Sequence, residues 1–191
     1  MTDKSANKRR HIVESSRSLI LRQGLRGTTM EAIAREAEVA KATLYAYFRD
    51  KDAVFAAVVD ALLDELDAAF EVGMASGGEL PERIGRALVR QFDVLAIALA
   101  GSPYATELMD DHRRAGLQLR EQEHLTERRI AEALAQAGAT DAHMLAHVVI
   151  ASAYGIALKT NDPAAREEAI LLLGRRVLEP ALRTSRGAQT A

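Results

Sequence analysis

Residues 28–51 read TTMEAIAREAEVAKATLYAYFRDK, and the spacing of their apolar side chains predicts two short helices joined by a tight turn. Thr28 and Glu31 have the spacing of a threonine-x-x-glutamate capping box, which predicts a helix that starts at Thr29. A second helix is predicted to begin near residue 40. Its inner face is predicted to consist of Ala40, Leu44 and Phe48.

The outer face of this second helix combines small side chains with hydrogen-bonding ones. Ala42 and Ala46 lie at its centre, flanked by Lys41, Thr43 and Tyr45. Small residues let a helix backbone approach a groove closely, and hydroxyl and ammonium groups reach base edges and phosphate oxygens. The predicted groove contacts are therefore Lys41, Ala42, Thr43 and Tyr45.

The residues around this helix predict contacts to the phosphate backbone. Asp50 is expected to cap a third helix, and Lys51 lies in its first turn, where a helix N-terminus and an ammonium group together favour an anion. The predicted phosphate contacts are Thr28, Thr29, Tyr47 and Lys51.

The runs TTMEAIAREA, VAKATLYAYF and DK resemble the DNA-binding domain of the TetR/AcrR family of transcriptional regulators, from about residue 10 to residue 59. The resemblance implies an all-α fold. It implies a helix-turn-helix DNA-binding domain of three helices over residues 1–55 and a helical effector-binding and dimerisation domain over residues 56–191. Glu38 and Ala40 stand where the family often has glycine and a capping serine.

The resemblance also implies a function: a repressor that releases a palindromic operator when a small-molecule effector binds the C-terminal domain. Three alternatives remain open. The chain could be an activator or an effector-independent regulator of the same fold, a helical module that docks a protein partner, or an enzyme that uses its histidines. No glycine-rich phosphate loop and no G-x-S-x-G motif supports the enzyme.

Charge and composition agree with a DNA-binding N-terminal third. Residues 1–51 carry eleven Lys/Arg and six Asp/Glu, whereas the remainder has an excess of acids. The absence of cysteine excludes disulfides and cysteine-ligated zinc. The N-terminus has no apolar signal segment, and the longest nearly apolar run, residues 144–158, is shorter than a membrane span of ~20 residues. We therefore expect a cytoplasmic protein with no membrane association and no cofactor.

The rest of the chain predicts further helices, separated by a loop at residues 73–78 and by Pro81, Pro103 and Pro163, with one interruption near Gly116. The last two long helices are more apolar than one core requires, and the first of them carries Ala151, Ser152 and Gly155. In the family that the chain resembles, the final two helices of each subunit form the dimer interface. A homodimer through these helices is therefore expected, and an ordinary intrachain core is the alternative.

An effector pocket is predicted from the large side chains of the C-terminal domain. The predicted pocket residues are Phe70, Phe92, Tyr104, Met109, His112, Met144 and Tyr154. His143 and His147 have a spacing compatible with a metal, but no third ligand accompanies them in sequence, so no metal site is predicted.

Overall fold

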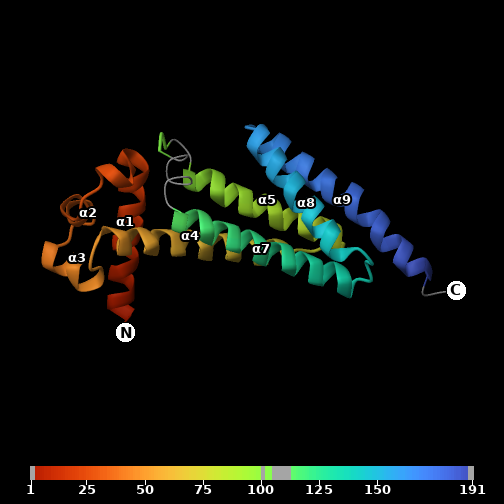
Figure 1. The fold of residues 1–191 in the computed structure, drawn as a ribbon, viewed down its shortest axis with the longest axis horizontal. Coiled ribbons are helices and arrows are strands. Elements are labelled where there is room, and N and C mark those ends of the chain that lie inside the picture. Colours follow the sequence, from red (N-terminus) through yellow and green to blue (C-terminus); the bar gives the residue numbers. More distant parts are fainter. Residues whose placement is uncertain (1–2, 100–101, 105–112, 189–191) are drawn as a thin grey trace. The chain divides into compact units, whose positions relative to one another are not determined.

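The secondary structure consists of helices joined by turns and loops, with no strand, in residues 3–99, 102–104 and 113–188, which are the residues that this computed structural model describes. The helices are α1 (Asp3–Gly27), α2 (Met30–Glu36), α3 (Lys41–Tyr47), α4 (Lys51–Met74), α5 (Leu80–Leu99), α7 (Arg113–Gln136), α8 (Ala142–Lys159) and α9 (Pro163–Ala188) (Figure 1). The predicted all-α fold class is confirmed.

The chain forms two compact units. The first comprises residues 1–64 and 98–119, and the second comprises residues 65–97 and 120–191. The division falls inside α4, α5 and α7, so each of these helices contributes one part to each unit. The predicted domain boundary at residue 55 is based on where the DNA-binding motif ends and not on the packing of the chain. It stays a prediction.

The first unit is built on α1, whose inner face packs against α2, α3 and the start of α4. The residues of this inner face are buried, namely Ile12, Ser16, Leu19 and Ile20. Gly24 interrupts the helix with a positive φ of 75°. The chain returns to a helical path after this kink and continues to Gly27.

Three details predicted from the sequence are wrong. Thr29, rather than Thr28, is the N-cap of α2, because its hydroxyl accepts a hydrogen bond from the Ala32 amide at 3.1 Å. Ala40 is exposed rather than part of the inner face. It is the N-cap of α3 and has an extended backbone, so helical periodicity does not yet place its side chain. Gly116 does not interrupt a helix but lies within α7.

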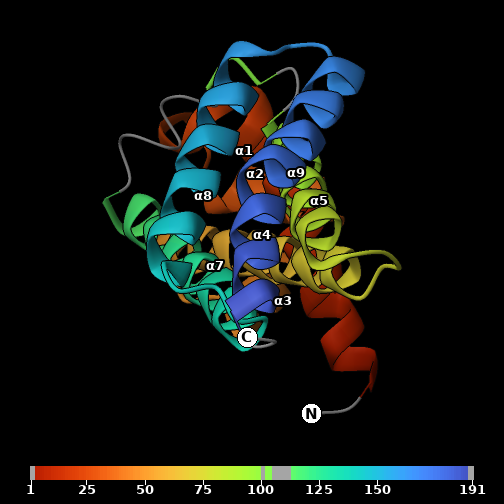
Figure 2. The ribbon, with the colours of Figure 1, turned by 90° about the vertical axis from the view of Figure 1, so that its right-hand side faces the viewer.

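The second unit has its own core, formed by α5, α7, α8, α9 and the end of α4. Its largest fully buried side chains are Phe70, Ile84, Ile130, Leu134, Val149, Ile170 and Leu178. Figure 2 views this unit from its C-terminal side, where α8 and α9 lie side by side. Asp162 caps the start of α9, since its carboxylate accepts hydrogen bonds from the amides of Ala164 and Ala165.

Two glycines let helices of the second unit approach closely. A Cβ atom at Gly73 would lie 2.3 Å from the Ala87 Cα, and one at Gly174 would lie 2.9 Å from the Pro81 carbonyl oxygen. The first contact joins α4 to α5 and the second joins α5 to α9. Within this unit, backbone approach therefore depends on the absence of a side chain at these positions.

Helix α8 is the one helix in the described part of the chain that is long and apolar enough to cross a membrane, and only 28% of its apolar window is buried. Its buried face packs on the core of the second unit. The other face carries apolar side chains that the chain itself leaves uncovered.

Candidate nucleic-acid interface

The turn between α2 and α3 is held by backbone bonds and by one unusual residue. The Val39 amide donates to the Ala34 carbonyl at 2.9 Å, which closes the end of α2. Glu38 has a φ of 51°, the left-handed region that glycine adopts without cost. The turn therefore places an exposed acid, Glu38, in a strained backbone position.

Helix α3 turns its predicted outer face to solvent. Lys41, Ala42, Tyr45 and Ala46 are exposed, whereas Leu44 is fully buried and anchors the helix on the core of the first unit. Thr43 is half-buried. The surface thus consists of two methyl groups bordered by an ammonium group and a phenol, with no bulky aliphatic side chain among these residues.

Lys41 already has a partner on this surface. Its Nζ donates a hydrogen bond to the Glu31 carboxylate in the first turn of α2, and it lies 5.9 Å from the centre of the Tyr45 ring. The hydrogen bond to Lys41 lowers the pKa of Glu31, and the same bond raises the pKa of Lys41. The role of Glu31 as the partner of Lys41 could not be recognised from the sequence. An acid in the first turn of a helix is typical of a capping residue, and Lys41 lies ten positions later.

Tyr47 and Phe48 connect α3 to the beginning of α1. The Tyr47 hydroxyl lies 3.3 Å from the Ser5 hydroxyl, and the guanidinium of Arg9 lies 5.2 Å from the centre of the Phe48 ring. Tyr47 is half-buried, so its hydroxyl lies at the edge of the surface rather than at its centre. These contacts bring the basic N-terminal turns of α1 next to the end of α3.

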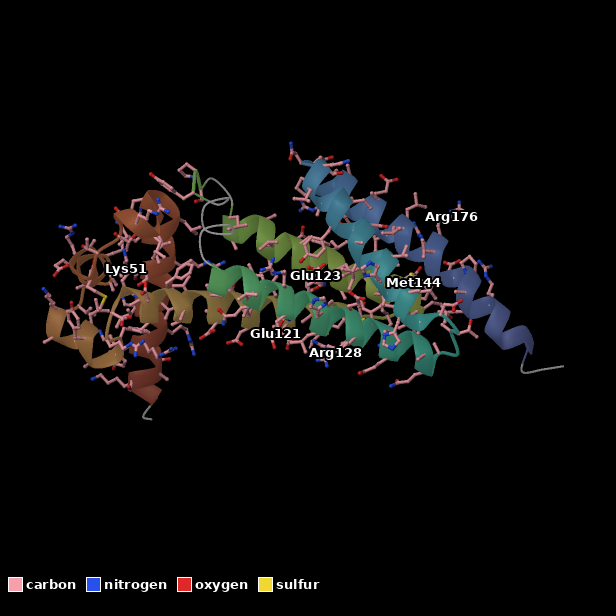
Figure 3. The ribbon with its side chains drawn as sticks, in the orientation of Figure 1. Lys51, Glu121, Glu123, Arg128, Met144 and Arg176 are labelled. Atoms are coloured by element: carbon pink, nitrogen blue, oxygen red, sulfur yellow. The ribbon has the colours of Figure 1, made fainter. Side chains whose placement is uncertain are left out.

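Lys51 and Thr28 bind the carbonyl groups at the end of α1. Lys51 Nζ donates to the Leu25 carbonyl at 2.8 Å, and the Thr28 hydroxyl donates to the Gly24 carbonyl at 2.7 Å. Asp50 caps α4 as expected, since its carboxylate accepts from the Ala53 amide at 2.7 Å. Thr28 is only 1% exposed, so its hydroxyl is not presented to a phosphate here. Lys51 is half-buried and keeps two further N–H donors (Figure 3).

This helix-turn-helix segment matches a known family. Residues 12–58 match the model described as "Bacterial regulatory proteins, tetR family". A chain from Bacillus subtilis (strain 168), described as an uncharacterized HTH-type transcriptional regulator, YhgD, is 29% identical over 84 residues. The matched segment, residues 12–58, therefore has the character of a TetR-family regulatory domain. The family and the matched relative are transcriptional regulators rather than enzymes.

The sequence match and the structural matches cover this chain to different extents. The match to the Bacillus protein covers 44% of each chain. A TetR-family regulator from Mesorhizobium loti superposes over 93% of this chain with a TM-score of 0.71 and 20% identity. One from Rhodococcus sp. superposes over 91% with a TM-score of 0.70 and 21% identity. The superpositions include 98% and 100% of those two chains, so both units of this protein share their fold with these regulators.

The residues predicted for the effector pocket are distributed over both units. Tyr104 belongs to the first unit, where its ring lies against the kink at Gly24. Phe70 and Phe92 are buried in the second core, and Tyr154 meets Phe92 edge-on with ring centres 5.0 Å apart. Met144 is 64% exposed on α8. Met109 and His112 lie outside the described residues.

The phenol of Tyr154 has a raised pKa. Burial, together with the nearby Glu123 carboxylate on α7, raises the pKa of its phenol to about 12 (Figure 3). The hydroxyl is therefore protonated at neutral pH and can donate a hydrogen bond.

The histidine pair on α8 does not gather further ligands in the described part of the chain. His143 and His147 are both exposed, and His147 Nδ1 lies 3.4 Å from the Glu127 carboxylate. Three or more His, Asp or Glu side chains that could hold a metal do not come together among residues 3–99, 102–104 and 113–188. One carboxylate beside one imidazole makes a weak ion pair that forms only when the histidine is protonated.

Proposed function

We propose that the protein binds a palindromic operator as a homodimer and represses transcription until an effector releases it. The observation that carries this proposal is the outer face of α3, where two exposed alanines are bordered by Lys41 and Tyr45. The turn bonds of Val39 and the burial of Leu44 hold this face outward. The predicted groove contacts are Lys41, Ala42, Thr43 and Tyr45, with Thr29, Tyr47 and Lys51 on phosphates.

The exposed face of α8 supports a homodimer. Met144, Val148 and Leu158 are 64%, 39% and 81% exposed, and they lie on one side of the helix with Ala151 and Gly155 between them. Leu172 on the neighbouring helix α9 is also 47% exposed. Figure 3 labels Met144 and Arg176 on these two helices. An apolar face with intervals of four and three residues is typical of a helix that packs on another helix.

Gly155 gives independent support for this interface. A Cβ atom added there would meet nothing within 4 Å, so the packing of the chain itself does not require a glycine. A glycine inside a helix costs roughly 0.5–1 kcal/mol relative to alanine. A second copy of α8 that approaches at this position provides a reason for the small residue.

Two connections support a regulated operator affinity. Helix α4 starts at Lys51 in the first unit and continues without a break into the second, so a shift of its axis reaches the DNA-binding helices. Residues 102–104 follow α5 and hold α1, since the Ser102 hydroxyl donates to the Leu21 carbonyl at 2.8 Å and Tyr104 lies against Gly24. A coupling of ~1–3 kcal/mol would change operator affinity by about 5- to 150-fold.

Selection of bound DNA from a random pool tests the function. We expect a palindromic motif whose half-sites are about 34 Å apart, as a two-fold dimer of reading helices requires. Lys41→Met should weaken the selected operator and relax base preference, whereas Lys51→Met should weaken operator and random DNA alike and reduce the salt slope by about one. Unfolding curves serve as the control for Lys51, because it also binds the Leu25 carbonyl. Recovery of no enriched motif, or of a motif without two-fold symmetry, would contradict the proposal.

An activator would bind the same operator, so DNA selection does not separate it from a repressor. The position of the selected motif relative to the promoter does, together with reporter transcription in the presence and absence of the protein. The repressor proposal requires that transcription rises when the gene for this protein is deleted. A fall in transcription would identify an activator.

A further inference from the structure

Glu31 and Lys41 face each other across the turn of the helix-turn-helix. Glu31 lies in the first turn of α2, and Lys41 is the first residue of α3. The Lys41 ammonium donates a hydrogen bond to the Glu31 carboxylate on one side and lies 5.9 Å from the centre of the Tyr45 ring on another. Both side chains are well exposed, at 57% for Lys41 and 62% for Glu31, so DNA can reach the pair.

A phosphate that approaches Lys41 must compete with the Glu31 carboxylate for the ammonium group. The carboxylate occupies one N–H of the ammonium and repels the incoming negative charge. The hydrogen bond lowers the pKa of Glu31, so the carboxylate stays ionised at neutral pH. Pairing with Glu31 therefore reduces what Lys41 can contribute to any phosphate contact.

The other acid of α2 that the structure pairs with a cation serves as an internal comparison. Glu36 accepts a hydrogen bond from Arg22 of α1 at 2.6 Å, at the far end of α2. Its partner lies on α1 and not on the outer face of α3. Removal of the Glu36 charge changes the net charge of the unit as removal of the Glu31 charge does, but leaves Lys41 paired.

We propose that Glu31 is a positioning residue that holds Lys41 back from phosphates, and thereby limits the affinity of this protein for DNA in general. The inference rests on the DNA-binding function proposed above. Sequence discrimination benefits, because a lysine that is free to bind any phosphate strengthens random DNA at least as much as the operator.

The first measurement compares Glu31→Gln with Glu36→Gln, using the operator recovered by selection and a random duplex of equal length. Exposed ion pairs are weak, so we expect Glu31→Gln to tighten operator binding about 2- to 5-fold. Binding to random DNA should tighten by the same factor or more. The slope of log affinity against log salt should steepen by about one unit, because one more cation neutralises a phosphate. Glu36→Gln should change affinity less and leave the slope unchanged.

A double-mutant cycle determines whether Glu31 acts through Lys41. In a Lys41→Met background, Glu31→Gln should no longer tighten binding or steepen the salt slope. In solution without DNA, NMR titration of the Glu31 carboxyl should show that Lys41→Met returns its pKa toward the ordinary value. Thermal unfolding of each variant identifies any loss of fold, which would lower affinity rather than raise it.

The outcomes separate this inference from the function on which it rests. If the wild-type protein binds no duplex, the DNA-binding proposal fails, and the inference fails with it. If the wild type binds and Glu31→Gln weakens or does not change affinity, the inference alone is wrong. Equal tightening by Glu31→Gln and Glu36→Gln, or tightening that persists without Lys41, also overturns it, because Glu31 would then act only through net charge.

Discussion

The outer faces of α3 and α8 share one design and differ in chemistry. Each places two small residues at the centre of an exposed helix face, Ala42 and Ala46 on α3, and Ala151 and Gly155 on α8. Around the first pair lie an ammonium group and a phenol, and around the second lie Met144, Val148 and Leu158. Small residues permit close approach in both cases. The residues around each small pair determine which partner fits, because polar groups suit a nucleic-acid groove and aliphatic groups suit another helix.

The largest effect should follow from a charge placed on the α8 face. Val148→Asp would bury two unpaired carboxylates in a symmetric dimer, at a cost of about 3 kcal/mol or more. We expect monomers by light scattering and a loss of operator affinity of about 100-fold or more. The matched control is Val72→Asp on α4, where the valine is 54% exposed and outside α8 and α9. If Val148→Asp remains a dimer, the exposed face of α8 is not the dimer interface, and the contrast between the α3 and α8 faces is wrong.

The next largest effect should come from bulk added to the α3 face. Ala46 is exposed, so Ala46→Leu should leave thermal stability unchanged while it holds the helix away from the groove. Loss of one base contact corresponds to a decrease in operator affinity of about 10- to 100-fold. Ala96→Leu on α5 makes the same change at another exposed site. Anisotropy measurements that give equal operator affinity for Ala46→Leu and Ala96→Leu would contradict this use of α3.

Two glycines separate packing inside the chain from packing between copies. Gly174→Ala would place a Cβ atom 2.9 Å from the Pro81 carbonyl oxygen and should destabilise the fold by about 1–3 kcal/mol. Gly155→Ala meets nothing within 4 Å. In the Val148→Asp monomer it should raise stability by about 0.5–1 kcal/mol, but in the otherwise wild-type protein it should raise the dimer dissociation constant. Urea unfolding and analytical ultracentrifugation measure the two quantities. Tighter dimers in Gly155→Ala would contradict the α8 interface.

The smallest effect concerns Tyr154, which lies on α8 but faces the core. Its pKa is raised from 10.0 to about 12, so the folded state favours the neutral phenol. The corresponding stability is complete below pH 10 and is lost as pH rises toward 12. An absorbance titration of phenolate should contain one late component that Tyr154→Phe removes. Tyr45→Phe on the exposed α3 face is the control and should leave this late component in place.

Much of the first unit could be predicted from its sequence because its signals are local. The buried stripe of α1, the start of α3 near Ala40 and the cap at Asp50 all depend on residues within a few positions of one another. The error at Thr28 has a physical reason. Either of two consecutive threonines could be the N-cap. The Thr28 hydroxyl instead donates a hydrogen bond to the Gly24 carbonyl at the kink of α1, so it does not cap α2.

The effector-pocket residues stay a prediction, because no local signal in the sequence groups them. Tyr104 was grouped with Phe92 and Tyr154 by size and polarity, but Tyr104 packs on Gly24 in the other compact unit. Helical periodicity gives the face on which a side chain lies, whereas it does not give the helix that this face meets.

By itself, the sequence determined the helical fold, the resemblance of residues 12–58 to a known regulator family and the chemistry of the α3 outer face, because these follow from short-range periodicity and residue type. Only the tertiary structure decided which charged groups meet. Glu31 holds Lys41, Lys51 holds the end of α1, and Gly174 rather than Gly155 is required by the packing of the chain. Such contacts depend on the packing of whole helices, and ten or more residues separate the partners.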